Sequence, residues 1–270
     1  MKKRLIAYPA FVVLMALAWM ISSWMATDAD EELFQSISGP TVKITIWHTV
    51  ADAEGSPTAR QMGHGTGVII AREKYAHFVL SAAHVSPEDA EVLRIEHPSF
   101  IGSKVAKVLD IDREHDLMLL VFIADSELPV ATIASREPSV TADVFLYGHG
   151  APSYAFATKG ILSAKQSAWF DAPEMWVVTS QVWFGCSGGG SYNRNGEFIG
   201  VVTRVRVSNG LPLSWQCGIV PLPTVKVFLK KAGMAVRKYT HTELAGTMAG
   251  YGTDTWRPLL PIYPDRQGDQ

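Results

Sequence analysis

From Thr41 onward the chain alternates short apolar runs, rich in Val, Ile, Phe and Thr, with breaks that contain Gly, Pro and Asp. Runs of this length and composition are typical of β-strands. Six predicted strands precede a polar stretch at 125–138: 41–49, 65–71, 76–81, 91–96, 104–111 and 117–123. Six more follow it: 142–147, 155–164, 175–180, 189–193, 197–207 and 211–220. Because a closed barrel leaves no strand edge unpaired, the pattern predicts an all-β fold of two six-stranded antiparallel β-barrels.

Two local signals add a turn and a helix to this fold. Asn195 and Gly196 stand between two predicted strands, and this dipeptide favours a tight hairpin turn because it tolerates positive φ angles. Residues 221–232 carry apolar side chains at helical spacing from Val225 to Leu229, with cations at the end. They predict one short C-terminal helix.

The domain limits follow from these elements. One globular domain is expected over 30–232, with its barrels at about 41–124 and 139–220. Residues 233–270 are interrupted by Gly and Pro, and we expect an irregular C-terminal tail there.

The N-terminal segment, 1–29, has the pattern of a membrane helix. Three cations at 2–4 precede the uncharged run Leu5–Ala26, and acidic residues follow it. About 20 apolar residues cross a bilayer as a helix, whereas the apolar region of a signal peptide usually has only about 7 to 15. The cations favour a cytoplasmic N-terminus, which places the remaining chain in the periplasm or outside the cell. The competing interpretation is a signal cleaved after Ala26 or Ala29, which would give a secreted protein.

Composition and charge narrow the class of protein. Hydrophobic residues make up 47% and charged residues 19% of 270, which indicates a globular chain rather than a disordered one. With 24 basic and 26 acidic residues the formal net charge is −2, so no basic field favours nucleic acid. Cys186 and Cys217 allow one disulfide at most, and their spacing leaves its existence open.

Three separated segments carry residues suited to nucleophilic catalysis. An apolar strand runs into His84, the acid Asp116 directly precedes the apolar run 117–120, and Ser187 is flanked by glycines on both sides. A serine hydroxyl needs a base to remove its proton, and the base needs an orienting partner. Ser187, His84 and Asp116 supply these three groups. The N–H groups of Gly185 and Ser187 are the expected donors to a tetrahedral oxyanion.

Other residues compete for these roles. Asp112 is the rival acid, and we expect it to cap the turn before Asp116 instead. Cys186 is the rival nucleophile, but the two glycines follow Ser187 directly, which selects the serine. A metal site could be sought among four more histidines: His48, His64, His115 and His149. No pair of these has a helical ligand spacing, so we predict neither a metal nor a cofactor.

The order His, Asp, Ser and several further motifs resemble the chymotrypsin-fold serine proteases, and within them the high-temperature-requirement (HtrA) type. The matching motifs are Gly65–Ile70, Tyr147–Gly150, Gly160–Ala164, Asn195–Val201 and Gly218–Pro221. Together they cover about residues 41–232. The chain departs from the family pattern at Cys186, where Asn or Asp is usual, and at Gly190, where Pro or Ala is usual. Too few residues follow the helix for a PDZ domain.

The resemblance also implies where a substrate side chain would bind. By register, the base of the pocket for the residue before the scissile bond lies near Gln181, and its walls are Thr203, Val205 and Gly218. None of these residues is charged, so we expect an uncharged, aliphatic preference at this P1 position. Four aromatic residues lie near this region in the sequence, and barrel packing is favoured over a role in substrate contact: Trp169, Trp176, Trp183 and Phe184.

The resulting expectation is a membrane-anchored, extracytoplasmic serine endopeptidase that takes protein or peptide substrates. The alternative is a protease-like binding module that keeps the fold but has lost turnover because Cys186 and Gly190 disturb the loop around Ser187, here called the nucleophile loop (185–189).

Overall fold

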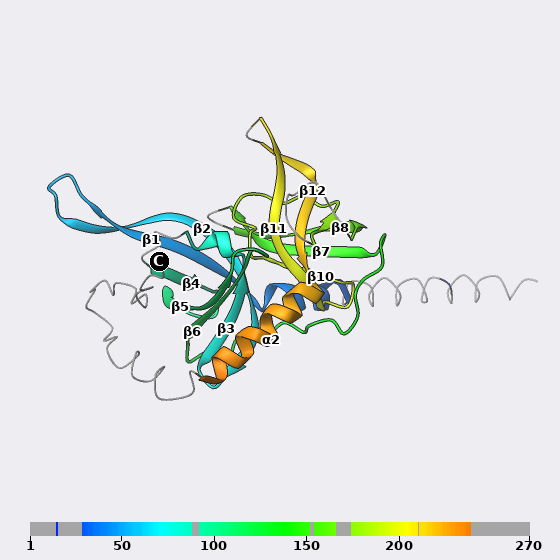
Figure 1. Ribbon diagram of the computed structural model, residues 1–270, viewed down its shortest axis with the longest axis horizontal. Coiled ribbons are helices and arrows are strands. Elements are labelled where there is room, and N and C mark those ends of the chain that lie inside the picture. Colours follow the sequence, from blue (N-terminus) through cyan, green and yellow to red (C-terminus); the bar gives the residue numbers. More distant parts are fainter. Residues whose placement is uncertain are drawn as a thin grey trace, which may run out of the picture.

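The computed structural model describes residue 15 and residues 29–87, 92–151, 154–165, 174–209 and 211–238. Across these residues the strands close into two six-stranded antiparallel barrels (Figure 1). The predicted all-β architecture is therefore confirmed.

The first barrel has the strand order β1-β2-β3-β6-β5-β4. Its strands are β1 (Thr41–Ala51), β2 (Pro57–Glu73), β3 (Ala76–Ser81), β4 (Val92–Glu96), β5 (Ser103–Asp112) and β6 (Leu117–Ile123). Alternate side chains point inward, so Ile44, Val79, Leu120 and Phe122 meet in one apolar cluster. Full burial of such a side chain stabilises the fold by about 1.5–3 kcal/mol, which fixes the strand register.

The second barrel has the strand order β10-β11-β12-β9-β8-β7. Its strands are β7 (Asp143–Ala151), β8 (Tyr154–Ala164), β9 (Trp176–Val178), β10 (Gly190–Tyr192), β11 (Phe198–Ser208) and β12 (Leu211–Pro221). Its interior is filled by residues such as Leu146, Trp176, Ile199 and Ile219. The polar stretch 125–138 connects the two barrels, as predicted.

The predicted hairpin turn joins β10 to β11. Gly196 has φ +72°, and its N–H donates to the carbonyl of Asn193 at 3.0 Å. A side chain at this position would also collide with Ser36, which belongs to a helical segment at 29–38. The turn therefore needs glycine both for its backbone angle and for its close packing.

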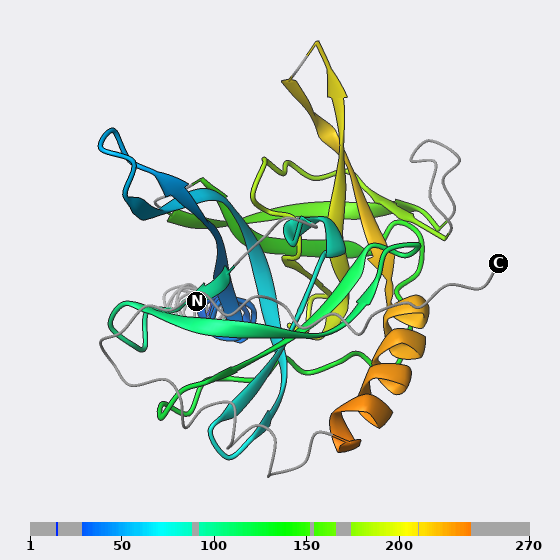
Figure 2. The same ribbon diagram turned by 60° about the vertical axis from the view of Figure 1, so that its left-hand side comes forward.

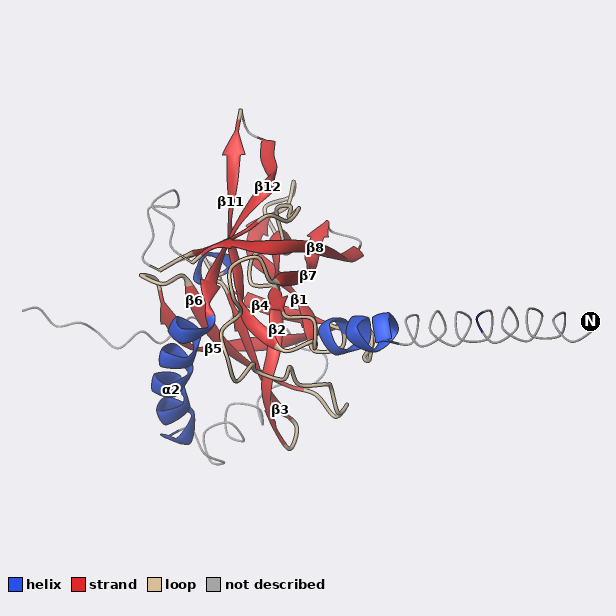
Figure 3. Cartoon of the chain, turned by 90° about the vertical axis from the view of Figure 1, so that its right-hand side faces the viewer, coloured by secondary structure: helices blue, strands red, loops and turns tan. Residues whose placement is uncertain are grey.

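Two helices pack on the barrels (Figure 3). The segment at 29–38, which the sequence analysis did not predict, buries Ile37 in the cluster between the barrels. Helix α2 (Leu222–Lys238) is the predicted C-terminal helix and runs six residues beyond its expected end at 232. It buries Val225 and Phe228 in the same cluster and contacts strands of both barrels. The two helices thus help to hold the barrels together.

Two hairpins extend beyond the barrel walls. The β1–β2 ribbon and the β11–β12 ribbon both project from the body of the molecule (Figure 2). Most of β2 before residue 63 is exposed, whereas its residues 65–69 are buried. Only the buried part had the apolar pattern that predicted a strand.

The proposed membrane segment lies outside the described residues, apart from Met15 and the start of the helix at 29–38. Among the helices that the structure describes, none combines the length and the apolar character needed to cross a bilayer. The predicted tail from 239 onward also lies outside the described residues.

Candidate active site

His84 and Asp116 are brought together by the pairing of two strands. His84 lies in the short 3₁₀ turn Ala83–Val85 just after β3, and Asp116 immediately precedes β6. Strands β3 and β6 are antiparallel, with Ser81 opposite Met118, so the end of one strand lies beside the start of the other. Residues 32 positions apart in the sequence therefore become neighbours.

The Asp116 carboxylate holds both the ring and the backbone of His84. Its Oδ2 and Oδ1 lie 2.8 and 3.0 Å from His84 Nδ1, and Oδ1 also accepts the backbone N–H of His84 at 3.0 Å. A carboxylate accepts hydrogen bonds, so Nδ1 carries the proton and Nε2 keeps a lone pair. The Asp116 side chain is 10% exposed, whereas the His84 side chain is 48% exposed. The carboxylate is sheltered and the ring edge that bears Nε2 is available to act as a base.

The nucleophile loop lies between β9 and β10 and turns tightly at Gly185, which has φ +98°. The N–H of Cys186 donates to Trp183 O at 3.0 Å, and that of Gly188 donates to Val202 O at 2.7 Å. The N–H groups of Gly185 and Ser187, in contrast, have no acceptor among the described residues. The two N–H groups predicted to donate to the oxyanion are therefore unpaired in this loop.

The nucleophile loop packs against the strand end that carries His84. A side chain on Gly188 would collide with Ser81 Oγ and would lie 3.1 Å from the backbone nitrogen of Ala82. Ser187 Oγ and His84 Nε2 are not hydrogen-bonded to each other in this part of the structure. Catalytic hydrogen bonds are often long without substrate and shorten when it binds, so the arrangement is compatible with a triad.

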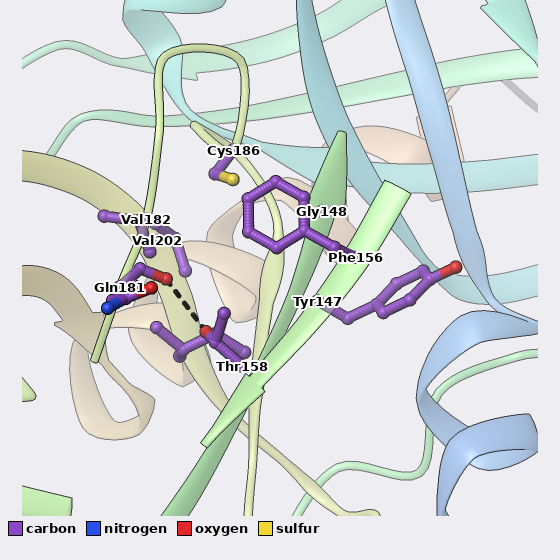
Figure 4. A pocket seen from close by; sticks show the side chains of 9 residues that line it. Tyr147, Gly148, Phe156, Thr158, Gln181, Val182, Cys186 and Val202 are labelled. Atoms are coloured by element: carbon purple, nitrogen blue, oxygen red, sulfur yellow. Dashed lines mark hydrogen bonds between the residues drawn. The ribbon is translucent and has the colours of Figure 1, made fainter. Parts of the chain in front are cut away.

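The four residues predicted to form the P1 pocket lie in the loop after β9 (Gln181), on β11 (Thr203 and Val205) and on β12 (Gly218). Gln181 lines a pocket between β7, β8 and the nucleophile loop, where its carbonyl accepts the Thr158 hydroxyl at 2.9 Å (Figure 4). Thr203 is buried with its hydroxyl 3.9 Å from Met175 Sδ. Val205 and Gly218 lie on the neighbouring strands β11 and β12, and β11 also contributes Val202 to the lining of that pocket.

Both cysteines are free thiols buried in the second barrel. Burial raises the pKa of Cys186 and of Cys217. A raised pKa disfavours the thiolate, which is the nucleophilic form of cysteine. This supports Ser187 over Cys186 as the attacking residue, and the disulfide left open by the sequence is not formed.

Asp112 caps the turn before Asp116, as predicted. Its carboxylate accepts the backbone N–H of His115 at 3.0 Å and lies 2.9 Å from His115 Nδ1. Burial works against ionisation, but the hydrogen bonds from His115 leave the pKa of Asp112 below its usual value. Among the residues that the structure describes, no cluster of three or more His, Cys, Asp or Glu could hold a metal ion.

His64 and His149 adjoin the nucleophile loop, a position that no pattern in the sequence indicated. His64 Nε2 donates to the carbonyl of His149 at 3.1 Å, and the His64 ring and this carbonyl both lie close to Gly185. Burial lowers the pKa of His64, and burial with the nearby Lys43 lowers that of His149 to about 4. Only the contact between the two barrels, which is distant in sequence, brings these rings together.

The depressed pKa of His149 predicts loss of stability in acid. The unfolded chain, with an imidazole pKa of about 6.5, binds a proton that the folded chain excludes until about pH 4. Stability should therefore fall by up to about 3 kcal/mol as the pH drops from 7 to 4. His149→Asn keeps the backbone N–H and should flatten this dependence in urea unfolding. Equal pH slopes for the two proteins would contradict it.

The aromatic residues near the loop divide into two groups. Trp176 is 4% exposed and packs in the barrel core, as predicted. Trp183 and Phe184 are 49% and 52% exposed and stack edge to face directly before Gly185. Barrel packing is thus the wrong interpretation for these two residues, while Trp169 lies outside the described residues.

Two six-stranded barrels that meet at a histidine–aspartate pair and a glycine-flanked serine define the chymotrypsin-like class of serine endopeptidases. The family model of the trypsin-like peptidase domain matches residues 65–201, half of the sequence, and the chain belongs to this family.

Among solved structures, the chain is similar to the serine endoprotease from Yersinia pestis, with a TM-score of 0.60 and 22% sequence identity. The match covers 75% of this chain and 65% of that one, so the chain spans about two thirds of its length. At this identity the likeness supports the fold alone. A search of curated proteins gave no match.

Proposed function

We propose that the protein hydrolyses peptide bonds through a triad of Ser187, His84 and Asp116. Ser187 Oγ attacks the carbonyl carbon while His84 Nε2 removes its proton, and His84 then donates this proton to the leaving amine. Water repeats the sequence on the acyl-enzyme and frees the second product. The observation that carries this proposal is the contact of Asp116 with Nδ1 of His84, because it leaves Nε2 free to act as the base.

The N–H groups of Gly185 and Ser187 are proposed to bind the oxyanion that forms during attack. One such donor is worth roughly 3–4 kcal/mol of transition-state stabilisation. Both groups lack an acceptor in the described chain, which supports the enzyme over the binding-module alternative. Cys186 and Gly190 do not prevent the loop from presenting these donors.

The experiment that tests this function is hydrolysis of casein by the purified protein. Activity should be abolished by a fluorophosphonate and unchanged by EDTA, because the nucleophile is a serine hydroxyl. Loss of activity with EDTA, or resistance to the fluorophosphonate, would refute the proposed mechanism.

We further propose an uncharged, aliphatic P1 preference. Gln181 and the other residues that line its pocket are all uncharged, which supports this preference. One methylene in an apolar pocket changes specificity by about 10- to 200-fold, so a peptide library should resolve it. Val, Ala or Leu should dominate at P1. Preferred cleavage after Lys or Arg would contradict the proposal.

The proposed location is extracytoplasmic, with residues 1–29 as a single-pass anchor. The support is the cationic start followed by the run Leu5–Ala26. Fractionation should find the full-length chain in the membrane, resistant to carbonate extraction. A soluble exported protein that begins at Thr27 or Asp30 would instead establish signal cleavage.

A further inference from the structure

Thr66 connects the first barrel to the nucleophile loop of the second. It lies in β2 and is fully buried. Its backbone N–H donates to Ser187 O at 2.8 Å, and its hydroxyl donates to Gly185 O at 2.7 Å. The same hydroxyl accepts the backbone N–H of His149 at 2.8 Å. One residue therefore binds two carbonyls of the nucleophile loop and the neighbouring turn of β7.

These hydrogen bonds fix two peptide units that adjoin the units bearing the Gly185 and Ser187 N–H groups. A peptide group is planar, so a fixed carbonyl fixes the orientation of the N–H on the same unit. Thr66 holds the carbonyls of Gly185 and Ser187, and the next N–H groups, of Cys186 and Gly188, are paired within the second barrel. Among residues 185–189, all of which the structure describes, only the N–H groups of Gly185 and Ser187 remain unpaired.

The surroundings of the Thr66 hydroxyl contain no space for another arrangement. A side chain on Gly185 would collide with His64 Nε2 and with the carbonyl of His149. A side chain on Gly148 would lie 3.2 Å from Thr66 Oγ1 and 3.3 Å from the Cα of Cys186. Loss of the hydroxyl would leave a carbonyl and an N–H unpaired in a packed interface, which is the costly way to lose a hydrogen bond.

We propose that Thr66 is a positioning residue that preorganises the oxyanion hole through its hydroxyl. It touches neither substrate nor the reacting atoms. It fixes the peptide units 185–186 and 187–188, which lie on both sides of the unit that bears the Ser187 N–H and adjoin the unit that bears the Gly185 N–H. The inference rests on the proposed function, since it assigns a purpose to the donors of that same site. The first barrel, which carries the base, thereby also sets the geometry of the oxyanion donors on the second.

The test compares Thr66→Val, which has nearly the same shape but no hydroxyl, with Thr66→Ser, which keeps the hydroxyl. Thr66→Val should lower kcat by about 10- to 100-fold and change KM by no more than about twofold. The fall in kcat is somewhat smaller than that expected for loss of an oxyanion-hole donor itself. Thr66→Ser should stay within about threefold of the wild type. Thr45→Val is the matched control, because Thr45 is a fully buried threonine of the same barrel whose hydroxyl accepts from Trp47. It should keep the wild-type kcat.

A second readout separates positioning from a merely structural effect. A peptide boronic acid with an aliphatic P1 residue forms an anionic tetrahedral adduct with the nucleophile, whereas the corresponding product peptide does not. Thr66→Val should weaken the boronate by the same factor as kcat and leave the product peptide unchanged. Equal weakening of both ligands, or a wild-type kcat, would overturn the proposal.

Two further comparisons cover the cases in which Thr66→Val is unstable or the wild type is inactive. If Thr66→Val proves too unstable to assay, Thr66→Cys replaces the hydroxyl with a weak thiol donor and should lower kcat while Thr66→Ser does not. A wild-type kcat for the cysteine variant would overturn the proposal. The wild type and Ser187→Ala are assayed in the same series: an inactive wild type would refute the proposed function, whereas an active wild type matched by Thr66→Val would refute only the role of Thr66.

Discussion

Replacement of Ser187 by alanine is expected to lower kcat by about 10⁶-fold. The substitution removes the attacking oxygen, and His84 then has no hydroxyl to activate. The fold should survive, because the loop is held through the backbone carbonyl of Ser187, which bonds Thr66 N–H at 2.8 Å. Peptide hydrolysis and thermal unfolding of the variant measure the two effects.

Ser191→Ala is the matched control for this experiment. Ser191 lies four residues further along, is fully buried, and its hydroxyl has no hydrogen-bond partner among the described residues. Its removal should leave kcat within about twofold and should not destabilise the fold, since no hydrogen bond is lost. Turnover by Ser187→Ala at the rate of Ser191→Ala would show that Ser187 is not the nucleophile.

The second large effect is expected for Asp116→Asn, which should lower kcat by about 10⁴-fold at neutral pH. An amide can place its NH₂ group against His84 Nδ1, which favours the tautomer with the proton on Nε2. That tautomer has no lone pair to accept the proton of Ser187. The loss should appear in kcat more than in KM, because Asp116 stabilises the imidazolium that forms only during the reaction.

Asp112→Asn tests whether the choice between the two acids is right. Asp112 also lies beside a histidine, 2.9 Å from His115 Nδ1, and differs from Asp116 in having no contact with His84 among the contacts of the described residues. Its substitution should weaken the turn by about 1 kcal/mol and leave kcat within a few-fold. If Asp112→Asn lost about 10⁴-fold in kcat while Asp116→Asn stayed active, Asp112 rather than Asp116 would be the acid of the triad.

Much of the fold could be predicted because burial leaves a local signature. Strand β6 is apolar almost throughout, and Gly196 sits in the turn that its dipeptide favours. The exposed start of β2 has no such signature. Its pairing with β1 makes it a strand, and the sequence pattern did not reveal this. The segment at 29–38 was missed because Ile37 becomes part of a core only when the barrels dock.

In the candidate site, the three proposed catalytic residues could be predicted from the sequence, but the contacts of the residues around them could not. His84, Asp116 and Ser187 each follow or precede a recognisable local pattern, and the chemistry of a serine nucleophile relates them. Thr66 and His149 lie in motifs that match the family, but no local pattern indicates their contact, since they lie 83 positions apart and meet only where the two barrels touch. Trp183 and Phe184 resemble core residues in the sequence, and only their exposure separates them from Trp176.

The central claim is that Ser187 is a nucleophile activated by His84. Mass spectrometry of the fluorophosphonate-treated protein tests it most directly. We expect a single adduct on Ser187, which disappears in Ser187→Ala and forms far more slowly in His84→Ala, while Ser191→Ala is labelled like the wild type. An adduct on a different residue, or none on Ser187 in the folded wild type, would contradict it.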